Sequence, residues 1–163
     1  MVYLVRHAHA GPKASWPGPD AARPLSAQGR REALGLIERL DGHPMDRVLS
    51  SPALRCLQTV EPLAGRLGRP VEPDEALGVD GTAVGVLELL VDPALERAVL
   101  CTHGELIGEV FDELRRTGLE LSDPPQWPKG CTWILRLGAG HAWRGTYLPP
   151  LAVEPAAQDP LPR

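Results

Sequence analysis

Short apolar runs alternate with longer amphipathic stretches along this chain, and this alternation is the feature that most restricts its fold. The runs at 2–6, 46–50 and 97–103 have the length of buried strands. The stretches at 27–40 and 105–117 carry apolar residues spaced three and four apart, as amphipathic helices do. Alternating strands and helices are typical of a mainly parallel sheet with helices on both faces. The sequence therefore predicts an α/β three-layer sandwich.

Two serines mark the predicted starts of helices. Ser26 is expected to cap the helix at 27–40. Ser51 is followed by Pro52, and proline is favoured at the first position of a helix. We therefore expect Ser51 to cap a second helix, which runs to about residue 67.

The end of the chain differs in pattern from the rest. The runs CTWILRL and HAWRGTYL, separated by GAG, predict a closing C-terminal hairpin. From Pro149 onward the sequence is rich in proline and alanine, and we expect it to pack loosely. A chain of 163 residues suits one domain. We predict a single domain over 1–148 and a Pro-rich tail over 149–163.

Composition excludes several classes of protein. The formal net charge of -4 argues against general nucleic-acid binding. No apolar run is long enough to span a membrane, and no basic leader with an apolar segment precedes the first strand. Three scattered cysteines without a CxxC pair fit neither a disulfide framework nor a zinc ribbon. We expect a cytoplasmic protein in which Cys101 and Cys131 are small core residues.

Polar residues follow the apolar runs at the point where each predicted strand ends. The first strand ends in Arg6 and His7, and a later one ends at His103. Arg55 lies one turn into the helix that follows the second strand. Ligands of open α/β sheets bind at the carboxyl ends of the strands. We therefore expect these four side chains to meet at one rim.

Two arginines and two histidines at such a rim suit the chemistry of a phosphoryl group. Arginines can bind phosphoryl oxygens in a fork, and helix N-termini offer free N–H groups. One histidine could attack phosphorus while the other donates a hydrogen bond to the transferring group. Fixed cations can neutralise the charge of the transition state, so we expect no metal ion and no cofactor.

These segments also resemble a known family. LVRHAHA resembles the RHxx signature of the histidine phosphatase (phosphoglycerate mutase-like) superfamily, SSPALRCLQTV its SSPxxRxxQT segment, and VLCTHGELI its second-histidine motif. DAARPLSAQGRREA resembles a pattern of the short bacterial members. These include phosphohistidine phosphatases and the histidine phosphatase domain appended to some Nudix hydrolases. The likeness covers roughly 2–148 and implies a phosphoglycerate mutase-like fold.

The resemblance also implies roles for the four residues. His7 would be the nucleophile that becomes phosphohistidine, and His103 would complete the pocket. Arg6 and Arg55 would bind the phosphoryl oxygens. The implied activity is that of a metal-independent phosphatase.

Larger members of the family carry an acid that protonates the leaving oxygen, and no motif selects its counterpart in this chain. The candidates are Glu72, Asp74, Glu75, Asp80 and Glu105. A general acid contributes roughly 10²–10⁴-fold when the leaving group is basic, and less when it departs easily. We therefore expect a phosphohistidine protein or a small nucleotide or phosphoanhydride as the substrate, and neither nucleic acid nor membrane as a partner.

Other residues lie near the predicted rim in the sequence. His9 is expected either to shape specificity at the rim or to have no role. Lys13 and Trp16, in the loop at 10–24, and Lys129 could reach a ligand. Asp20 and Arg23 are expected to tie down the same loop. Trp127, Trp133 and Trp143 are expected to pack in the core and the hairpin.

Two alternatives from other classes remain. A metal-dependent hydrolase could use the His7-x-His9 pair, although Arg6 would repel the cation and Glu105 is the only evident carboxylate ligand. A binding module could recognise a phosphorylated partner without turnover. The substrate and the oligomeric state stay open at this point, because specificity is expected in the loops at 10–24, 74–81 and 122–130.

Overall fold

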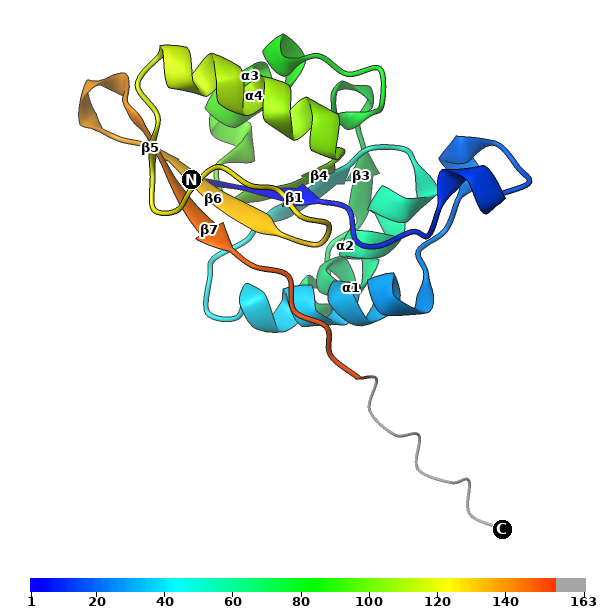
Figure 1. Cartoon of the computed structure of the whole chain (residues 1–163). Coiled ribbons are helices and arrows are strands. Elements are labelled where there is room, and N and C mark those ends of the chain that lie inside the picture. Colours follow the sequence, from blue (N-terminus) through cyan, green and yellow to red (C-terminus); the bar gives the residue numbers. More distant parts are fainter. Residues whose placement is uncertain (155–163) are drawn as a thin grey trace.

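The computed structural model of the chain describes residues 1–154, and its centre is a seven-stranded sheet in the order β3-β2-β4-β1-β6-β7-β5 (Figure 1). The strands are β1 (Val2–Arg6), β2 (Arg47–Ser50), β3 (Val71–Pro73), β4 (Ala98–Thr102), β5 (Glu120–Leu121), β6 (Thr132–Leu137) and β7 (Trp143–Leu148). The α-helices are α1 (Ala27–Arg39), α2 (Leu54–Leu67), α3 (Ala83–Val91) and α4 (Gly104–Arg116). Helices α1 and α2 cover one face of the sheet and α3 and α4 the other, which confirms the predicted three layers.

The pairing of the strands confirms a mainly parallel sheet. Strands β3, β2, β4 and β1 are neighbours and run parallel. Strand β6 pairs antiparallel with β1 and with β7, and the latter pair is the predicted C-terminal hairpin. Strand β5 was not predicted, because two residues are too short to show the alternation of a strand.

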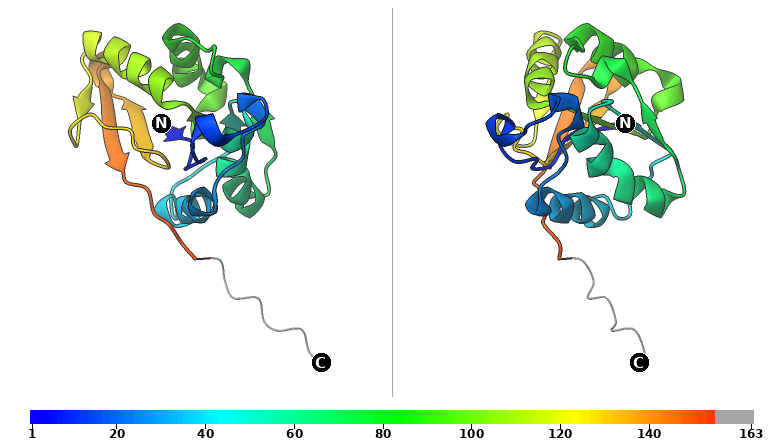
Figure 2. Two further views of the ribbon diagram at one scale, coloured as in Figure 1. Left: turned by 45° about the vertical axis from the view of Figure 1, so that its right-hand side comes forward. Right: turned by 90° about the vertical axis from the view of Figure 1, so that its right-hand side faces the viewer.

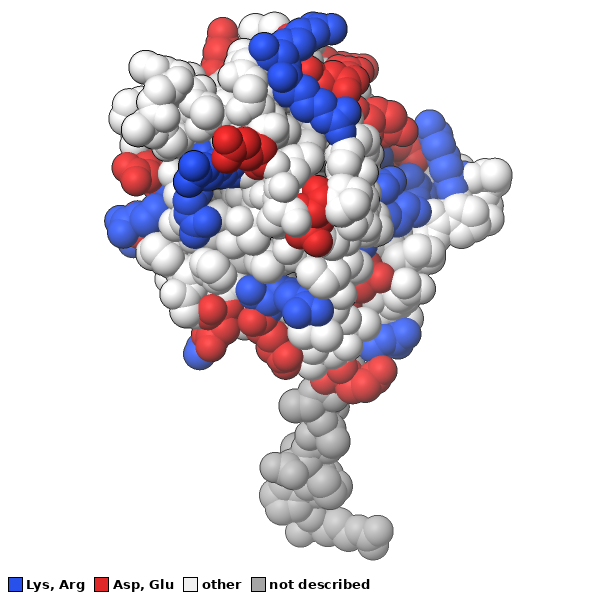
Figure 3. All heavy atoms as spheres, turned by 60° about the vertical axis from the view of Figure 1, so that its left-hand side comes forward, with Lys and Arg blue, Asp and Glu red and all other residues white. Residues whose placement is uncertain are grey.

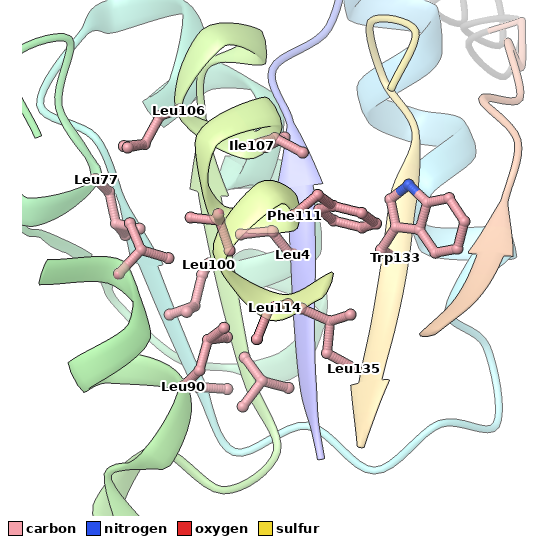
Figure 4. Packing of buried hydrophobic residues seen from close by; sticks show 14 of the residues in the cluster. Leu4, Leu77, Leu90, Leu100, Leu106, Ile107, Phe111, Leu114, Trp133 and Leu135 are labelled. Carbon is pink, nitrogen blue, oxygen red and sulfur yellow. The ribbon is translucent and has the colours of Figure 1, made fainter. Parts of the chain in front are cut away.

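Alternate residues of the central strands pack on opposite faces of the sheet. Val2 and Leu4 belong to the cluster under α3 and α4, and Tyr3 and Val5 to the cluster under α1 and α2. In Figure 4, Phe111 of α4 lies over the sheet beside Trp133, with ring centroids 5.1 Å apart. Such aromatic pairs contribute about 0.5–1.5 kcal/mol beyond their buried area.

The predicted core residues lie where expected. Cys101, Cys131 and Trp133 are fully buried, and Trp143 is nearly so. Trp127 is partly buried and packs against the same cluster as Trp133. This cluster supports α4, whose first residue lies at the end of the sheet where the polar residues gather.

The two predicted caps have different outcomes. Ser26 caps α1 as expected, because its Oγ accepts a hydrogen bond from Gly29 N at 3.1 Å. The prediction for Ser51 and Pro52 is wrong, because α2 begins only at Leu54 and has no side-chain cap. Ser51 Oγ accepts a hydrogen bond from Ala53 N at 3.2 Å, ahead of the helix, and lies 2.8 Å from His103 Nε2. The side chain that the local pattern assigned to the helix cap thus forms a turn and a tertiary contact.

The loop at 10–24 contains no α-helix, in agreement with its proline and glycine content. It holds two short 3₁₀ turns, Lys13–Ser15 and Asp20–Ala22. Both views of Figure 2 show this loop beside α2, beyond the end of β1. Its placement makes the loop part of the wall around the strand ends.

Part of the predicted tail packs against the body of the protein. Val153 N donates to Arg31 O at 3.0 Å, and a Cβ built on Gly35 would lie 1.7 Å from Leu151 O. The expectation of loose packing is therefore wrong for 149–154, while 155–163 lie outside the described residues. The predicted end of the domain at residue 148 stays a prediction. No helix within the described part of the chain is both long and apolar enough to cross a membrane.

Candidate active site

The register of β1 and β4 brings two histidines together. Arg6 pairs with Thr102 across these parallel strands, so the next residues, His7 and His103, leave the sheet side by side. His7 N donates to Thr102 O at 3.0 Å, which extends the pairing by one residue. The two rings lie 5.5 Å apart between centroids and meet edge to face at 64°.

A cavity of about 410 Å³ opens at this edge of the sheet. All four residues predicted to share a rim line it: Arg6, His7, Arg55 and His103. They come from β1, α2 and the start of α4, which confirms the expected convergence of strand ends. Lys13 and Lys129 also line this cavity, so both reach the rim as the sequence suggested.

A backbone carbonyl determines the protonation of His7. Its Nδ1 lies 2.8 Å from Ala8 O. Because a carbonyl can only accept a hydrogen bond, Nδ1 carries the proton and Nε2 keeps a free electron pair. Burial lowers the pKa of His7 to about 3, and the charges of Arg55, His103 and Arg6 act in the same direction. The imidazole is therefore neutral at physiological pH.

His103 is held on both sides of its ring. Ser51 Oγ lies 2.8 Å from Nε2, and Arg55 Nη2 lies 3.4 Å from Nδ1, the long end of hydrogen-bond range. An arginine can only donate, so Nδ1 accepts and Nε2 donates to Ser51. The ring is nearly fully buried, so these two contacts determine its orientation.

Arg6 is packed tightly against the first turn of α4. Its Nη1 donates to Trp127 O at 2.7 Å, while its Nε is buried without a hydrogen-bond partner among the described residues. A Cβ built on Gly104 would lie 2.7 Å from Arg6 Cζ. Only glycine leaves room for this approach, which the sequence did not reveal.

Arg55 and the loop at 10–24 are joined through Asp20. Arg55 donates to Asp20 O at 2.9 Å and to its Oδ2 at 3.1 Å, and Arg23 Nε donates to its Oδ1 at 2.9 Å. These bonds confirm that Asp20 and Arg23 tie down the loop. Arg55 Nε, like that of Arg6, is buried and has no partner within the described residues. Unsatisfied buried donors cost free energy, which an oxyanion in the cavity could recover.

Two residues considered for the rim, His9 and Trp16, do not line the cavity, and for His9 this leaves the expectation of no role there. His9 does not line the cavity, because its Nδ1 lies 2.7 Å from Ser26 Oγ at the start of α1. His7 and His9 therefore do not converge, and residues 1–154 contain no group of three or more metal-ligating side chains. Trp16 also lies outside this cavity, where its Nε1 donates to Pro19 O at 2.9 Å.

Of the five candidate acids, only Glu105 lines the cavity. Glu72 pairs with Arg47, and Asp74 accepts from Ala76 N. Glu75 and Asp80 line a second cavity of about 470 Å³, which shares Lys13, Asp20 and Val79 with the first. The structure thus separates carboxylates that no sequence motif distinguished.

Two supporting residues were missed although they lie within a motif that the sequence analysis used. Ser51 orients His103, as described above. Thr59 Oγ1 accepts from Ala8 N at 2.9 Å and donates to Arg55 O at 2.7 Å. Thr59 therefore connects the end of β1 to α2. Both residues lie in the segment SSPALRCLQTV, and its resemblance to the family motif is the sequence feature that could have identified them.

Comparison with known proteins agrees with this geometry. The model of the histidine phosphatase superfamily (branch 1) matches residues 2–78, which include three of the four rim residues. The chain is 31% identical over 156 residues to the 8-oxo-(d)GTP phosphatase of Mycolicibacterium smegmatis, a match that covers 91% of this chain and 48% of that protein. The chain thus spans about half the length of this relative.

Two further matches cover most of both partners. The chain is 30% identical over 121 residues to the phosphohistidine phosphatase SixA of Escherichia coli, covering 70% of this chain and 73% of that protein. A solved structure of the protein histidine phosphatase SixA complexed with tungstate aligns with a TM-score of 0.70 at 25% identity. That alignment covers 93% of this chain and 96% of the other, and it confirms the α/β fold class.

Proposed function

Because this chain belongs to the histidine phosphatase superfamily, we propose that it is a phosphatase that acts through a phosphohistidine formed on His7, without a metal ion. The observation that carries this proposal is the neutral His7 ring, with Nδ1 bonded to Ala8 O among cationic side chains. Its substrate is phosphohistidine or a nucleotide phosphoanhydride.

In the first step, the substrate phosphoryl group lies against Arg6 and Arg55. Nε2 of His7 attacks phosphorus, the Nε2–P bond forms, and the bond to the leaving group breaks with its electron pair on that group. The guanidinium groups balance charge on the phosphoryl oxygens. His103, held at Nε2 by Ser51, faces Arg55 Nη2 with its Nδ1 and so helps to orient the guanidinium group toward the phosphoryl oxygens. Ala8 O stabilises the positive ring of the intermediate.

In the second step, water attacks phosphorus and the P–Nε2 bond breaks. Both hydrogens of the water leave with the phosphate as H₂PO₄⁻, and His7 returns to its neutral form. Glu105, the candidate acid that lines the cavity, is placed to orient this water or to protonate a leaving group.

The comparisons support the substrate classes. One relative is named for phosphohistidine and another for an oxidised nucleoside triphosphate. In both compounds the leaving group departs easily, which agrees with the absence of a motif for a general acid. The similar structure holds tungstate, an oxyanion like a phosphoryl group, which supports phosphoryl binding by this fold.

The test measures phosphate release in the presence of EDTA from phosphohistidine peptide, nucleoside di- and triphosphates, p-nitrophenyl phosphate and phosphoglycerate. We expect release that is insensitive to EDTA, falls at least about 10³-fold in His7→Ala, and is unchanged in His141→Ala, which alters an exposed turn residue. Brief exposure to ³²P-labelled substrate should label the wild-type protein in an acid-labile form, and not His7→Ala.

Two results would contradict the proposal in different ways. Loss of activity with EDTA alone would indicate a metal-dependent hydrolase. Binding of these compounds without any release of phosphate would indicate a binding module.

A further inference from the structure

The cavity holds more positive charge than one phosphoryl group requires. Arg6, Lys13, Arg23, Arg55 and Lys129 line it, against the two carboxylates Asp20 and Glu105. Asp20 is already shared by Arg23 and Arg55. The two lysines have no ion pair within the described residues. They are also the only lysines of the whole chain, whose other basic side chains are arginines.

A tight turn holds Lys129 beside the strand end that carries His7. Cys131 N donates to Pro128 O at 3.1 Å, and Gly130, with a φ of 80°, forms the corner. Gly130 N also approaches His7 O at 3.1 Å, which fixes the turn to the end of β1. Lys129 is half-buried, and burial lowers the pKa of its ammonium group, as do the charges of Arg6, Arg23 and Arg55. An anion in this position would relieve the repulsion.

Lys13 lies on the loop at 10–24, in the 3₁₀ turn Lys13–Ser15. It lines both the first cavity and the adjoining one of about 470 Å³. The adjoining cavity has apolar walls from Pro52, Ala53 and Val79, together with the carboxylates Glu75 and Asp80. Lys13 thus stands where the two cavities meet.

We propose that Lys129 and Lys13 form a subsite for a second phosphoryl group, so that the preferred substrate is a phosphoanhydride such as a nucleoside diphosphate. This inference rests on the proposed function and specifies its substrate class. The terminal phosphoryl group lies against Arg6 and Arg55, and the adjacent phosphate lies at the two lysines. The nucleoside occupies the adjoining cavity, where Glu75 and Asp80 accept hydrogen bonds from hydroxyl and amino groups.

The reaction balances without a further reactant. His7 Nε2 bonds to the terminal phosphorus, the bond from that phosphorus to the bridging oxygen breaks, and the nucleoside monophosphate leaves with the oxygen and its electron pair. Lys129 and Lys13 neutralise the charge that develops on this leaving phosphate. Water then releases inorganic phosphate from His7. Nucleoside diphosphate and water thus give nucleoside monophosphate and phosphate.

Charge elsewhere on the molecule favours this assignment of the lysines. On the face shown in Figure 3, basic and acidic side chains are interspersed, whereas the cavity gathers cations. A phosphohistidine residue or a simple monoester offers one phosphoryl group and leaves both lysines without a partner. The carboxylates of the adjoining cavity repel a third phosphate, so a diphosphate fits better than a triphosphate.

The experiment compares GDP with p-nitrophenyl phosphate, which has a good leaving group and no second phosphate. In Lys129→Gln we expect kcat/KM for GDP to fall about 10- to 100-fold, as for a lost hydrogen bond to a charged group, with a higher KM and a lower kcat, because Lys129 both binds the second phosphate and balances its charge as it leaves. For p-nitrophenyl phosphate the change should stay within about twofold. Lys13→Gln should act in the same direction with a smaller effect, because Lys13 is exposed.

Arg30→Gln is the matched control, since it removes one positive charge from an exposed position on α1 outside both cavities. It should leave both substrates unaffected. Calorimetry with a methylene-bridged GDP analogue should show weaker binding in Lys129→Gln without relying on turnover.

Different results would contradict the lysine subsite and the proposed function. Equal losses for GDP and p-nitrophenyl phosphate in Lys129→Gln, or a wild-type preference for phosphohistidine peptide over GDP, would overturn the subsite. Neither result would affect the proposed function, which fails if His7→Ala retains activity or if no acid-labile label forms on the wild-type protein.

Discussion

At the scale of single residues, His7 combines a fixed hydrogen bond with an unfavourable environment for positive charge. Ala8 O holds the proton on Nδ1, while burial and two neighbouring arginines disfavour a second proton. The free protein therefore keeps Nε2 available over the whole neutral and mildly acidic range. The same environment has a consequence for stability that can be measured without any substrate.

We predict that His7 makes folding less stable as the pH falls below 6.5. The unfolded chain takes up a proton on this histidine near pH 6.5, whereas the folded protein does so only near its pKa of about 3. Between these values the unfolding free energy should fall by up to about 1.4 kcal/mol per pH unit from this group alone. Urea unfolding between about pH 6 and pH 4 should show a shallower decline for His7→Gln than for the wild type. Parallel curves would mean that His7 titrates normally in the folded protein.

At the scale of elements, the start of α4 supports Arg6 through the absence of a side chain at Gly104. The backbone of the first helical turn lies directly against the guanidinium group, which is thereby fixed beside His103. The position of a helix thus determines the orientation of a side chain that belongs to a strand.

We predict that Gly104→Ala displaces Arg6 and lowers kcat/KM by about 10-fold or more, the effect of one lost hydrogen bond to a charged group. The unfolding free energy should change by less than about 1 kcal/mol, because the guanidinium end of the Arg6 side chain can move and alanine favours the helix. Steady-state kinetics and thermal unfolding check both parts.

Gly65→Ala, in the interior of α2, is the control for this substitution. A Cβ at Gly65 meets nothing within 4 Å, so this variant should gain roughly 0.5–1 kcal/mol and keep full activity. Unchanged activity in Gly104→Ala would show that Arg6 tolerates a shift or has no part in the reaction.

At the scale of the whole molecule, an acidic protein with a formal charge of -4 concentrates cations in one cavity. Like charges at short range oppose folding, so the site weakens the stability of the free protein. Arg6 and Arg55 each also contain a buried Nε without a partner among the described residues. A bound oxyanion should therefore stabilise the fold as a whole.

We predict that inorganic phosphate raises the unfolding free energy by about 2.7 kcal/mol when its concentration is 100 times its Kd. Sodium chloride at the same ionic strength should leave the unfolding free energy unchanged, because it supplies no tetrahedral oxyanion. Arg6→Met should lose most of the phosphate effect in thermal unfolding, and calorimetry should show correspondingly weaker binding. An equal shift in wild type and Arg6→Met would place the phosphate elsewhere.

Much of the fold and the membership of the cavity could be predicted from local sequence. Apolar runs and helical spacing determine which residues form strands and helices, because these patterns depend on neighbours a few positions apart. The rule that strand ends meet at one edge then placed Arg6, His7, Arg55 and His103 together. Strand β5 could not be predicted, because two residues are too few to show the alternation of polar and apolar residues that is typical of a strand.

How these residues are used depends on contacts that form in the folded protein. Ser51 turned from a helix cap to a partner of His103, Asp20 joined a loop to Arg55, and Glu105 was separated from four other carboxylates. Lys129 reached the cavity through a turn that binds to the end of β1. Each of these contacts joins segments that are distant in the sequence, and local patterns contain no information on which distant groups will meet. Local sequence patterns thus account for the helices and strands and for the types of residue at their ends, while the packing of these elements accounts for the protonation of His7, the orientation of His103 and Arg6, and the balance of charge in the cavity.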